Sequence, residues 1–251
     1  METKMYYVRR MTYQFISISL LLMLSISFVY ADKTQSVVSA EATFLYHNKY
    51  ISDGKDDLPG SGIYTPEFVI NFESLPIGSA ELKDFYVGGW WAIGDDESYT
   101  ETNLFLGKVF NWQNFSLDLS YTWLYFSPDD DEDHELVAAL GCDCTPWFDP
   151  EVSYVYSTEG DGGALSLALA KDIETSYLSI TPYILSMFDF GYVSDEYDGL
   201  NHIEVGLELS IPINDTISIQ GYAAHAFAEE NLRREGYDDE TWAGFGLQFD
   251  I

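Results

Sequence analysis

The stretch Phe115-Ser-Leu-Asp-Leu-Ser-Tyr-Thr-Trp123 decides the fold class of this chain. Large apolar side chains occupy its odd positions, and Ser, Asp and Thr occupy its even positions. Successive side chains of an extended strand point to opposite faces. The alternation therefore predicts a β-strand with one apolar and one polar face, and it does not fit the 3.6-residue period of a helix.

The same alternation recurs along the chain, for example over residues 203–213 and 243–251. Most of these segments are longer than the roughly 5–6 residues of an ordinary soluble strand. They suit a tilted strand that crosses a bilayer, which needs about 9–11 residues. The twelve predicted strands cover residues 37–50, 62–74, 83–94, 99–111, 115–127, 134–142, 150–158, 163–171, 176–190, 200–213, 216–228 and 240–251.

These segments predict an all-β protein, a single antiparallel transmembrane β-barrel of about twelve strands. Arg9 and Arg10 precede an apolar run over residues 15–29, and Val29-Tyr30-Ala31 fits a small-x-small cleavage rule. We therefore expect a signal peptide over residues 1–31 and an outer-membrane barrel over residues 32–251. After residue 31 no apolar run reaches the length of a transmembrane helix.

The chain is strongly acidic, with 42 Asp and Glu against 11 Lys and Arg and a formal net charge of −31. This balance excludes nucleic acid as a partner, because phosphate binding needs clustered basic residues. Alternate connectors between the predicted strands carry much of the acid, above all the run 129–133. We therefore expect one acidic rim, on the outer face of the membrane.

Cysteine and aromatic residues give weaker signals. Two cysteines exclude a disulfide framework, and a bond between Cys142 and Cys144 would be strained in an extended chain. Aromatic girdles mark the membrane interfaces of outer-membrane barrels. The expected girdle residues lie toward segment ends: Trp90, Trp91, Tyr99, Trp112, Trp123, Tyr125, Tyr192 and Trp242.

The opening segment, Glu41-Ala-Thr-Phe-Leu-Tyr-His-Asn-Lys-Tyr-Ile-Ser-Asp-Gly54, and the following Tyr64-Thr-Pro66 resemble the start of the Gcw_chp family of bacterial outer-membrane proteins. That family has an Arg before the glycine, where this chain has Asp53. The resemblance implies an outer-membrane β-barrel, and it implies no chemistry, because the family has no established activity.

No catalytic constellation stands out among the four histidines, and we expect a protein that is not an enzyme. One alternative is an outer-membrane barrel enzyme with a rim active site, in which His134 is the base and Asp131 or Asp133 orients it. Another is a soluble periplasmic acidic β-sandwich that serves as a binding module. We expect no cofactor beyond weakly bound calcium or magnesium at Asp129, Asp131 and Asp133, because hard cations prefer oxygen ligands.

The polar faces of the strands predict what lines the barrel. Rings of carboxylates favour cations, so we expect a narrow cation-preferring pore or an acidic surface protein. A channel for acidic sugars would need Lys and Arg instead. The expected partners are outer-membrane lipid, lipopolysaccharide and, through the C-terminal strand, the barrel-assembly machinery. The predicted lumen-facing carboxylates are Glu41, Glu67, Glu73, Asp118, Glu204 and Glu208.

Overall fold

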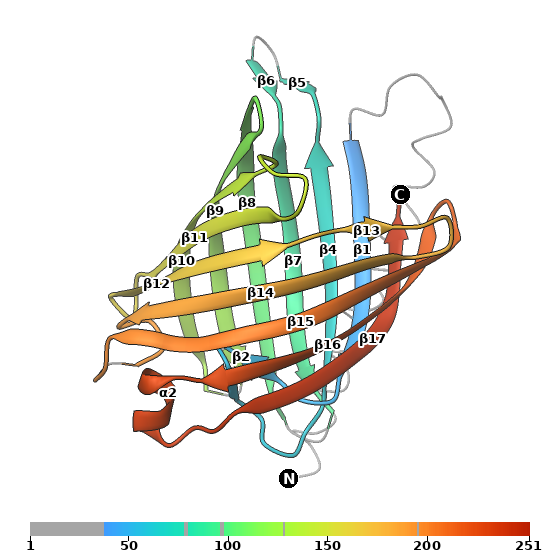
Figure 1. Cartoon of the computed structure of the whole chain (residues 1–251). Helices are drawn as coiled ribbons and strands as arrows, with labels where there is room; N and C mark the ends of the chain where they lie inside the picture. The colour runs from blue at the N-terminus through green and yellow to red at the C-terminus, as the bar shows by residue number, and fades with distance from the viewer. Residues whose placement is uncertain (1–37, 78–79, 96–97, 128, 195) are drawn as a thin grey trace, which may run out of the picture. The chain divides into compact units, whose positions relative to one another are not determined.

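Twelve long antiparallel strands form a closed barrel in the computed structural model (Figure 1). The structure describes residues 38–251 except 78–79, 96–97, 128 and 195, so the predicted signal peptide lies outside the described residues. The barrel strands are β1 (Val38–His47), β4 (Ile63–Phe72), β7 (Phe85–Gly94), β8 (Thr100–Trp112), β9 (Phe115–Ser127), β10 (Asp131–Cys142), β11 (Asp149–Ser157), β12 (Gly162–Ala170), β14 (Ser179–Phe190), β15 (Gly199–Asn214), β16 (Ile217–Ala228) and β17 (Glu240–Asp250).

Each barrel strand pairs with the barrel strand before it and the one after it in sequence. The ring closes where β1 pairs with β17, with Ala42 opposite Phe249 and Tyr46 opposite Phe245. A sandwich would leave strand edges between two sheets, whereas each of the twelve barrel strands has a partner on both sides. The sandwich alternative is therefore wrong, and the barrel prediction is confirmed.

The predicted strands agree with the observed strands to within a few residues. The differences are largest at the end of β1 and at the starts of β10 and β14. β10 begins at Asp131 rather than at residue 134, because Asp131 and Glu132 pair with Phe126 and Tyr125 of β9. Shorter elements lie in the connectors: β2 (Ile51–Ser52), β3 (Lys55–Asp56), β5 (Leu75–Ile77), β6 (Ala80–Leu82), β13 (Ile173–Glu174) and the helix α2 (Glu230–Glu235). No helix among the described residues is long and apolar enough to cross a membrane.

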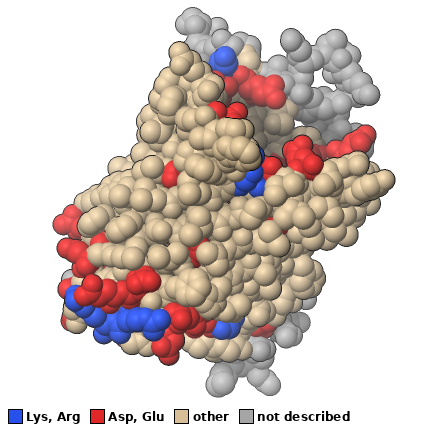
Figure 2. Space-filling view, in the orientation of Figure 1, with Lys and Arg blue, Asp and Glu red and all other residues tan. Residues whose placement is uncertain are grey.

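The outer face of the barrel is apolar. Leu104, Leu106, Leu136 and Phe245 each leave more than two fifths of their surface exposed. Exposure of this kind all round a barrel would be costly in water, because apolar surface costs about 25 cal/mol per Å² there. Figure 2 shows few charges on the flank and a concentration of them at the end that carries α2. A bilayer accounts for this surface, because lipid chains cover the apolar side chains. A closed barrel is stable there because the backbone N–H and C=O groups of every strand bond to a neighbouring strand.

The two ends of the barrel differ in their connectors. We call the acidic end the one formed by the described residues of the connectors 48–62, 95–99, 129–130, 158–161, 191–198 and 229–239, which leaves out 96–97 and 195. The opposite end, the turn end, has the tight connectors between β8 and β9 and between β15 and β16, together with the hairpin β5–β6. Cys142 and Cys144 form a disulfide at the turn end. Their Cα atoms are 5.2 Å apart, within the usual range, because Cys144 lies beyond the end of β10.

The aromatic prediction needs a correction. Trp90 and Trp91 are neighbours in β7, so they point to opposite faces, and Trp90 lines an interior cavity. Tyr99 and Tyr192 line the same cavity, and Trp242 is buried in a cluster with Ala224 and Ala226. These residues lie at strand ends as expected, yet they face the lumen. Trp112 and Trp123 do lie on the outer face, stacked on Phe115 and Tyr125 respectively.

Candidate binding site at the acidic end of the barrel

The connector from β1 to β4 folds into a small hairpin. Ile51 pairs with Asp56 and Ser52 with Lys55, which leaves Asp53 and Gly54 as a two-residue turn. Both turn residues have positive φ, 51° at Asp53 and 84° at Gly54. An Asp-Gly pair is among the sequences that favour such a type I′ turn. We call residues 50–57 the mouth hairpin.

The tip of the mouth hairpin docks on β15. Asn201 donates a hydrogen bond from Nδ2 to the backbone oxygen of Asp53, at 2.7 Å. Gly54 lies against the ring of His202, and a Cβ atom at residue 54 would be 2.6 Å from His202 Cγ. Asn201 and His202 are both buried. The hairpin therefore leaves β1, extends over the lumen and is held at its far end by the barrel wall.

A buried carboxylate holds the neighbouring connectors in place. Asp189, at the end of β14, accepts hydrogen bonds from the backbone amides of Tyr192, Val193 and Ser194, at 2.8–2.9 Å. It also accepts one from Asn231 of α2, at 2.8 Å. Asp189 is fully buried. This one side chain therefore ties the connector 191–198 and α2 to the wall beside the mouth hairpin.

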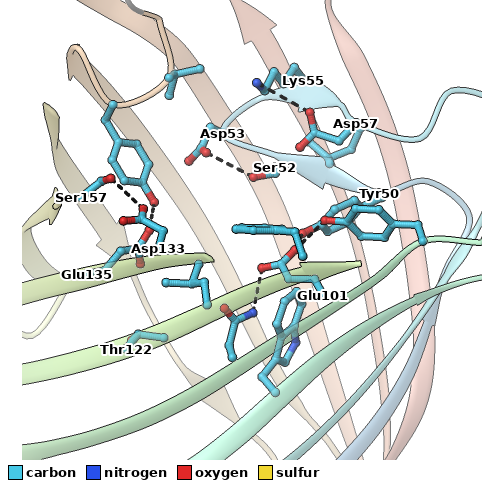
Figure 3. A pocket seen from close by; sticks show the side chains of 18 residues that line it. Tyr50, Ser52, Asp53, Lys55, Asp57, Glu101, Thr122, Asp133, Glu135 and Ser157 are labelled. Atoms are coloured by element: carbon cyan, nitrogen blue, oxygen red, sulfur yellow. Dashed lines mark hydrogen bonds and ion pairs between the residues drawn. The ribbon is translucent and has the colours of Figure 1, made fainter. Parts of the chain in front are cut away.

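A cavity of about 540 Å³ lies between the mouth hairpin and the barrel wall (Figure 3). Trp90, Leu124 and Phe126 supply apolar surface. The polar lining is dominated by carboxylates, which reach the cavity from the hairpin and from β8 and β10, with Lys55 as the only cation among the lining residues. The five carboxylates are Asp53, Asp57, Glu101, Asp133 and Glu135.

Neutral donors hold these carboxylates in place. Glu101 accepts hydrogen bonds from the hydroxyls of Tyr50 and Tyr99 and from Asn103 Nδ2, the last two at 2.8 Å. Glu135 accepts one from the Tyr192 hydroxyl, at 2.5 Å. The donors orient the oxygens and leave the negative charge uncompensated. Buried charge of this kind attracts an opposite charge into the cavity.

Asp133 is oriented in the same way. It accepts hydrogen bonds from the Ser157 hydroxyl, at 2.6 Å, and from the backbone amides of His134 and Glu159. Lys55 is paired with Asp57 at 3.7 Å on the hairpin. Figure 3 shows Asp133 and Glu135 on one side of the cavity and Glu101 on the other, with Asp53 on the hairpin. A guest in the cavity would therefore meet negative charge from several directions.

Titration of the hairpin acids follows from their surroundings. Burial raises the pKa of Asp57 from 3.8 to about 6, a net value in which the charge of Lys55 opposes burial while the charges of Asp53 and Glu101 reinforce it. Burial also raises the pKa of Asp53, against the hydrogen bond from Ser52 and the charge of Lys55. The docked hairpin therefore favours the neutral form of both acids.

The mouth hairpin is expected to be docked most firmly at low pH. Because the pKa of Asp57 is raised in the folded state, its contribution is fully present below pH 3.8 and is lost as pH rises through about 6. Protease cleavage within the hairpin should be slower at pH 5 than at pH 8. Asp57→Asn should weaken this dependence, whereas Asp198→Asn, at an exposed position in the connector between β14 and β15, should keep it. Equal cleavage at both pH values would contradict the prediction.

The predicted lumen residues can be placed by strand register. The cross-strand pairs Thr43–Glu67 and Thr43–Gln248 join a polar face that runs around the barrel. Glu204 and Glu208 share that face with Ala226 and Tyr222 of β16. Asp118 accepts hydrogen bonds from the Tyr86 hydroxyl at 2.7 and 2.9 Å. Glu73 lies beyond the end of β4 and is exposed, so it is not part of a strand.

The proposed rim active site is divided by the wall of the barrel. His134 stacks on Tyr121 on the outer face, with 2.6 Å between its Nδ1 and the Tyr121 hydroxyl. Asp133, its neighbour in β10, lines the interior cavity, and Asp131 lies at the same strand parity. Alternation along the strand therefore separates the histidine from both acids, and the structure does not form the suggested base and orienter.

Metal binding at the acidic run receives no geometric support. Among the described residues, no group of three or more His, Cys, Asp or Glu side chains is arranged to hold a metal ion. Asp133 is occupied by Ser157 and two backbone amides, while Asp129 and Asp131 are exposed. The three residues proposed as ligands are therefore not brought together.

The sequence analysis singles out Asp133 as a candidate functional residue, but it does not predict the cavity that Asp133 lines. Glu101 and Asn103 show the period of a strand face, although nothing in that segment indicates which face is inward. The insertion of the mouth hairpin depends on Asn201 and His202, which are far away in sequence.

Comparison with solved structures agrees with this architecture. The KdgM porin superposes with a TM-score of 0.53 at 11% identity, covering 83% of this chain and 98% of that chain. The NanC porin superposes with a TM-score of 0.50 at 10% identity, covering 84% and 98%. The sequence matches no protein-family model and no curated protein, so the resemblance to the Gcw_chp family is not confirmed.

The closed ring of strands and its apolar outer face define a transmembrane β-barrel. The chain shares this fold with two solved porins, and its fold is therefore a porin-like barrel. Closed antiparallel barrels with an apolar outer face are structures of the bacterial outer membrane.

Proposed function

We propose that the protein is a passive outer-membrane channel that prefers cations and performs no catalysis. The observation that carries the proposal is the charge of the inward strand face. Glu41, Glu67, Asp118, Glu204 and Glu208 lie on this face. Within the twelve described barrel strands, no Lys or Arg occupies an inward position, and Lys108 of β8 packs outside on Phe85 and Phe110.

The interior is accessible below the mouth hairpin. Inward-facing Ser116, Asp118 and Ser120 of β9 are only half-buried, and Gly141 opposite Ser116 has no side chain. Small inward side chains on β12 leave further room, including Ala164, Ser166 and Ala168. A water-filled interior lined with carboxylates favours cations over anions. We also propose that lipid and lipopolysaccharide surround the barrel and that the barrel-assembly machinery inserts it.

Cation preference is tested by the reversal potential of the purified barrel in a planar bilayer under a potassium chloride gradient. We expect the reversal potential to differ from zero in the direction of the potassium equilibrium potential. Glu67→Lys should move it toward the chloride side, because Glu67 and Glu41 act on the same stretch of lumen. Glu132→Lys makes the same exchange at a position that contacts outward-facing Trp123, and it should have little effect.

Two results would remove the proposal. A barrel that inserts, shifts in mobility when boiled and yet passes no current is not a channel. A conducting barrel whose reversal potential lies on the chloride side is a channel with the opposite preference.

A further inference from the structure

The cavity under the mouth hairpin has the size and the lining of a small-molecule site. Its volume of about 540 Å³ falls within the roughly 300–1,000 Å³ typical of ligand pockets, and it greatly exceeds the space of a single ion. Aromatic and carboxylate side chains share its walls, including Trp90, Phe126, Glu101 and Glu135. Aromatic faces and carboxylates together favour organic cations.

One buried atom in this cavity is without a partner. Asn103 is only 7% exposed, and its Oδ1 makes no hydrogen bond. Its Nδ2 donates to Glu101 Oε1 at 2.8 Å, which fixes the orientation of the amide, because a carboxylate only accepts. The free atom is therefore a buried acceptor, and its residue is one of those that line the cavity. An acceptor left unpaired in a buried position is costly, and a donor supplied by a guest would remove that cost.

These two observations are independent and restrict the guest. The carboxylates require positive charge, and Asn103 Oδ1 requires a hydrogen-bond donor. An ammonium group with N–H bonds meets both conditions, whereas a quaternary ammonium meets only the first. A metal ion is disfavoured, since no three of the acids converge on one point among the described residues.

The acids also lie on more than one side of the cavity. Glu101 is held by Tyr50 and Tyr99, while Glu135 is held by Tyr192 from the connector after β14. Figure 3 shows these two carboxylates apart, on different parts of the cavity lining. A guest with a positive group at each end would interact with both, and the aromatic walls would contact its alkyl chain.

We propose that this cavity is a binding site for an alkyl diamine or a related polyamine. Its ammonium groups pair with Glu101 and Glu135, and one N–H donates to Asn103 Oδ1. The inference goes beyond the proposed function, because binding here does not require ions to cross the barrel.

The test is isothermal titration of the folded full-length protein in detergent at low salt, with 1,4-diaminobutane as the probe. We expect saturable binding at one site that weakens as salt rises. The fully N-methylated bis-quaternary analogue should bind about tenfold more weakly, because it cannot donate to Asn103. In Asn103→Leu, the diamine should lose about this factor and the difference between the two probes should disappear.

Glu135→Gln should also weaken diamine binding at least about tenfold, since a charge-assisted contact is lost. The matched control is Glu132→Gln, which lies in the same strand on the opposite face and should bind as the wild type does. A mobility shift on boiling shows that each variant is folded.

Several outcomes would overturn the proposal. They are absence of diamine binding, equal binding of both probes to the wild type, and equal binding of the diamine to the wild type and Glu135→Gln. Saturable binding of magnesium chloride without diamine binding would also overturn it. Cation-selective conduction without diamine binding would leave the channel intact and remove the site. Diamine binding without conduction would support the binding site and remove the proposed channel function.

Discussion

Replacing Gly54 by alanine is expected to raise the single-channel conductance several-fold. The new Cβ atom would lie 2.6 Å from Cγ of His202, which is buried and has little room to move. Residue 54 also has a φ of 84°, where a side chain costs about 1–2 kcal/mol. The mouth hairpin should therefore leave its dock on β15 and unblock the acidic end. Planar-bilayer recordings measure the change.

Gly60→Ala is the control for this variant. Gly60 lies in the same connector, with a φ of 90°, and a Cβ atom there would meet nothing within 4 Å. The two variants thus share the backbone strain and differ in the clash. If both variants raise conductance equally, strain alone is responsible. If neither does, the hairpin does not limit conduction.

Replacing Asp189 by alanine is expected to loosen the acidic end by about 3 kcal/mol or more, because four donors, two of them buried, lose their acceptor. The connector 191–198 and α2 should become sensitive to protease, while the strands persist. Tyr192 should also leave Glu135, so binding at the cavity should fall. Urea titration with proteolysis at each step measures the effect.

Asp198→Ala provides the comparison, because Asp198 is an exposed acid in the same connector. It should change neither proteolysis nor stability measurably. Asp189→Asn should have an intermediate effect, since the amide keeps one acceptor oxygen. Wild-type protease resistance in Asp189→Ala would show that the connectors are held by other contacts.

The strands could be predicted from the sequence because a barrel wall has one apolar face along its whole length. The alternation at residues 115–123 therefore covers most of β9, and the segments 203–213 of β15 and 243–251 at β17 repeat it. The predicted segment 115–127 and the observed strand coincide. Such periodicity involves only neighbouring residues, so it can be recognised in one sequence without knowledge of the tertiary contacts.

The cavity could not be predicted in the same way. It forms where the mouth hairpin meets Asn201 and His202, a contact between residues far apart in the sequence. Trp90 illustrates the difficulty, because its place at a strand end suggested a membrane girdle while the parity of β7 turned it inward. The sequence shows that the connectors are acidic, but it does not show that the mouth hairpin folds over the lumen.

The pairing of β1 with β17 bears on the rate at which the barrel folds. Every other neighbouring pair in the ring consists of barrel strands consecutive in sequence, so those contacts are local and can form early. The last seam joins the two ends of the barrel sequence, with Glu41 opposite Asp250. Its loop-closure entropy is the largest in the ring, and nonlocal contacts of this kind slow folding. We expect closure of this seam to be the rate-limiting step, with open-edged intermediates accumulating before it.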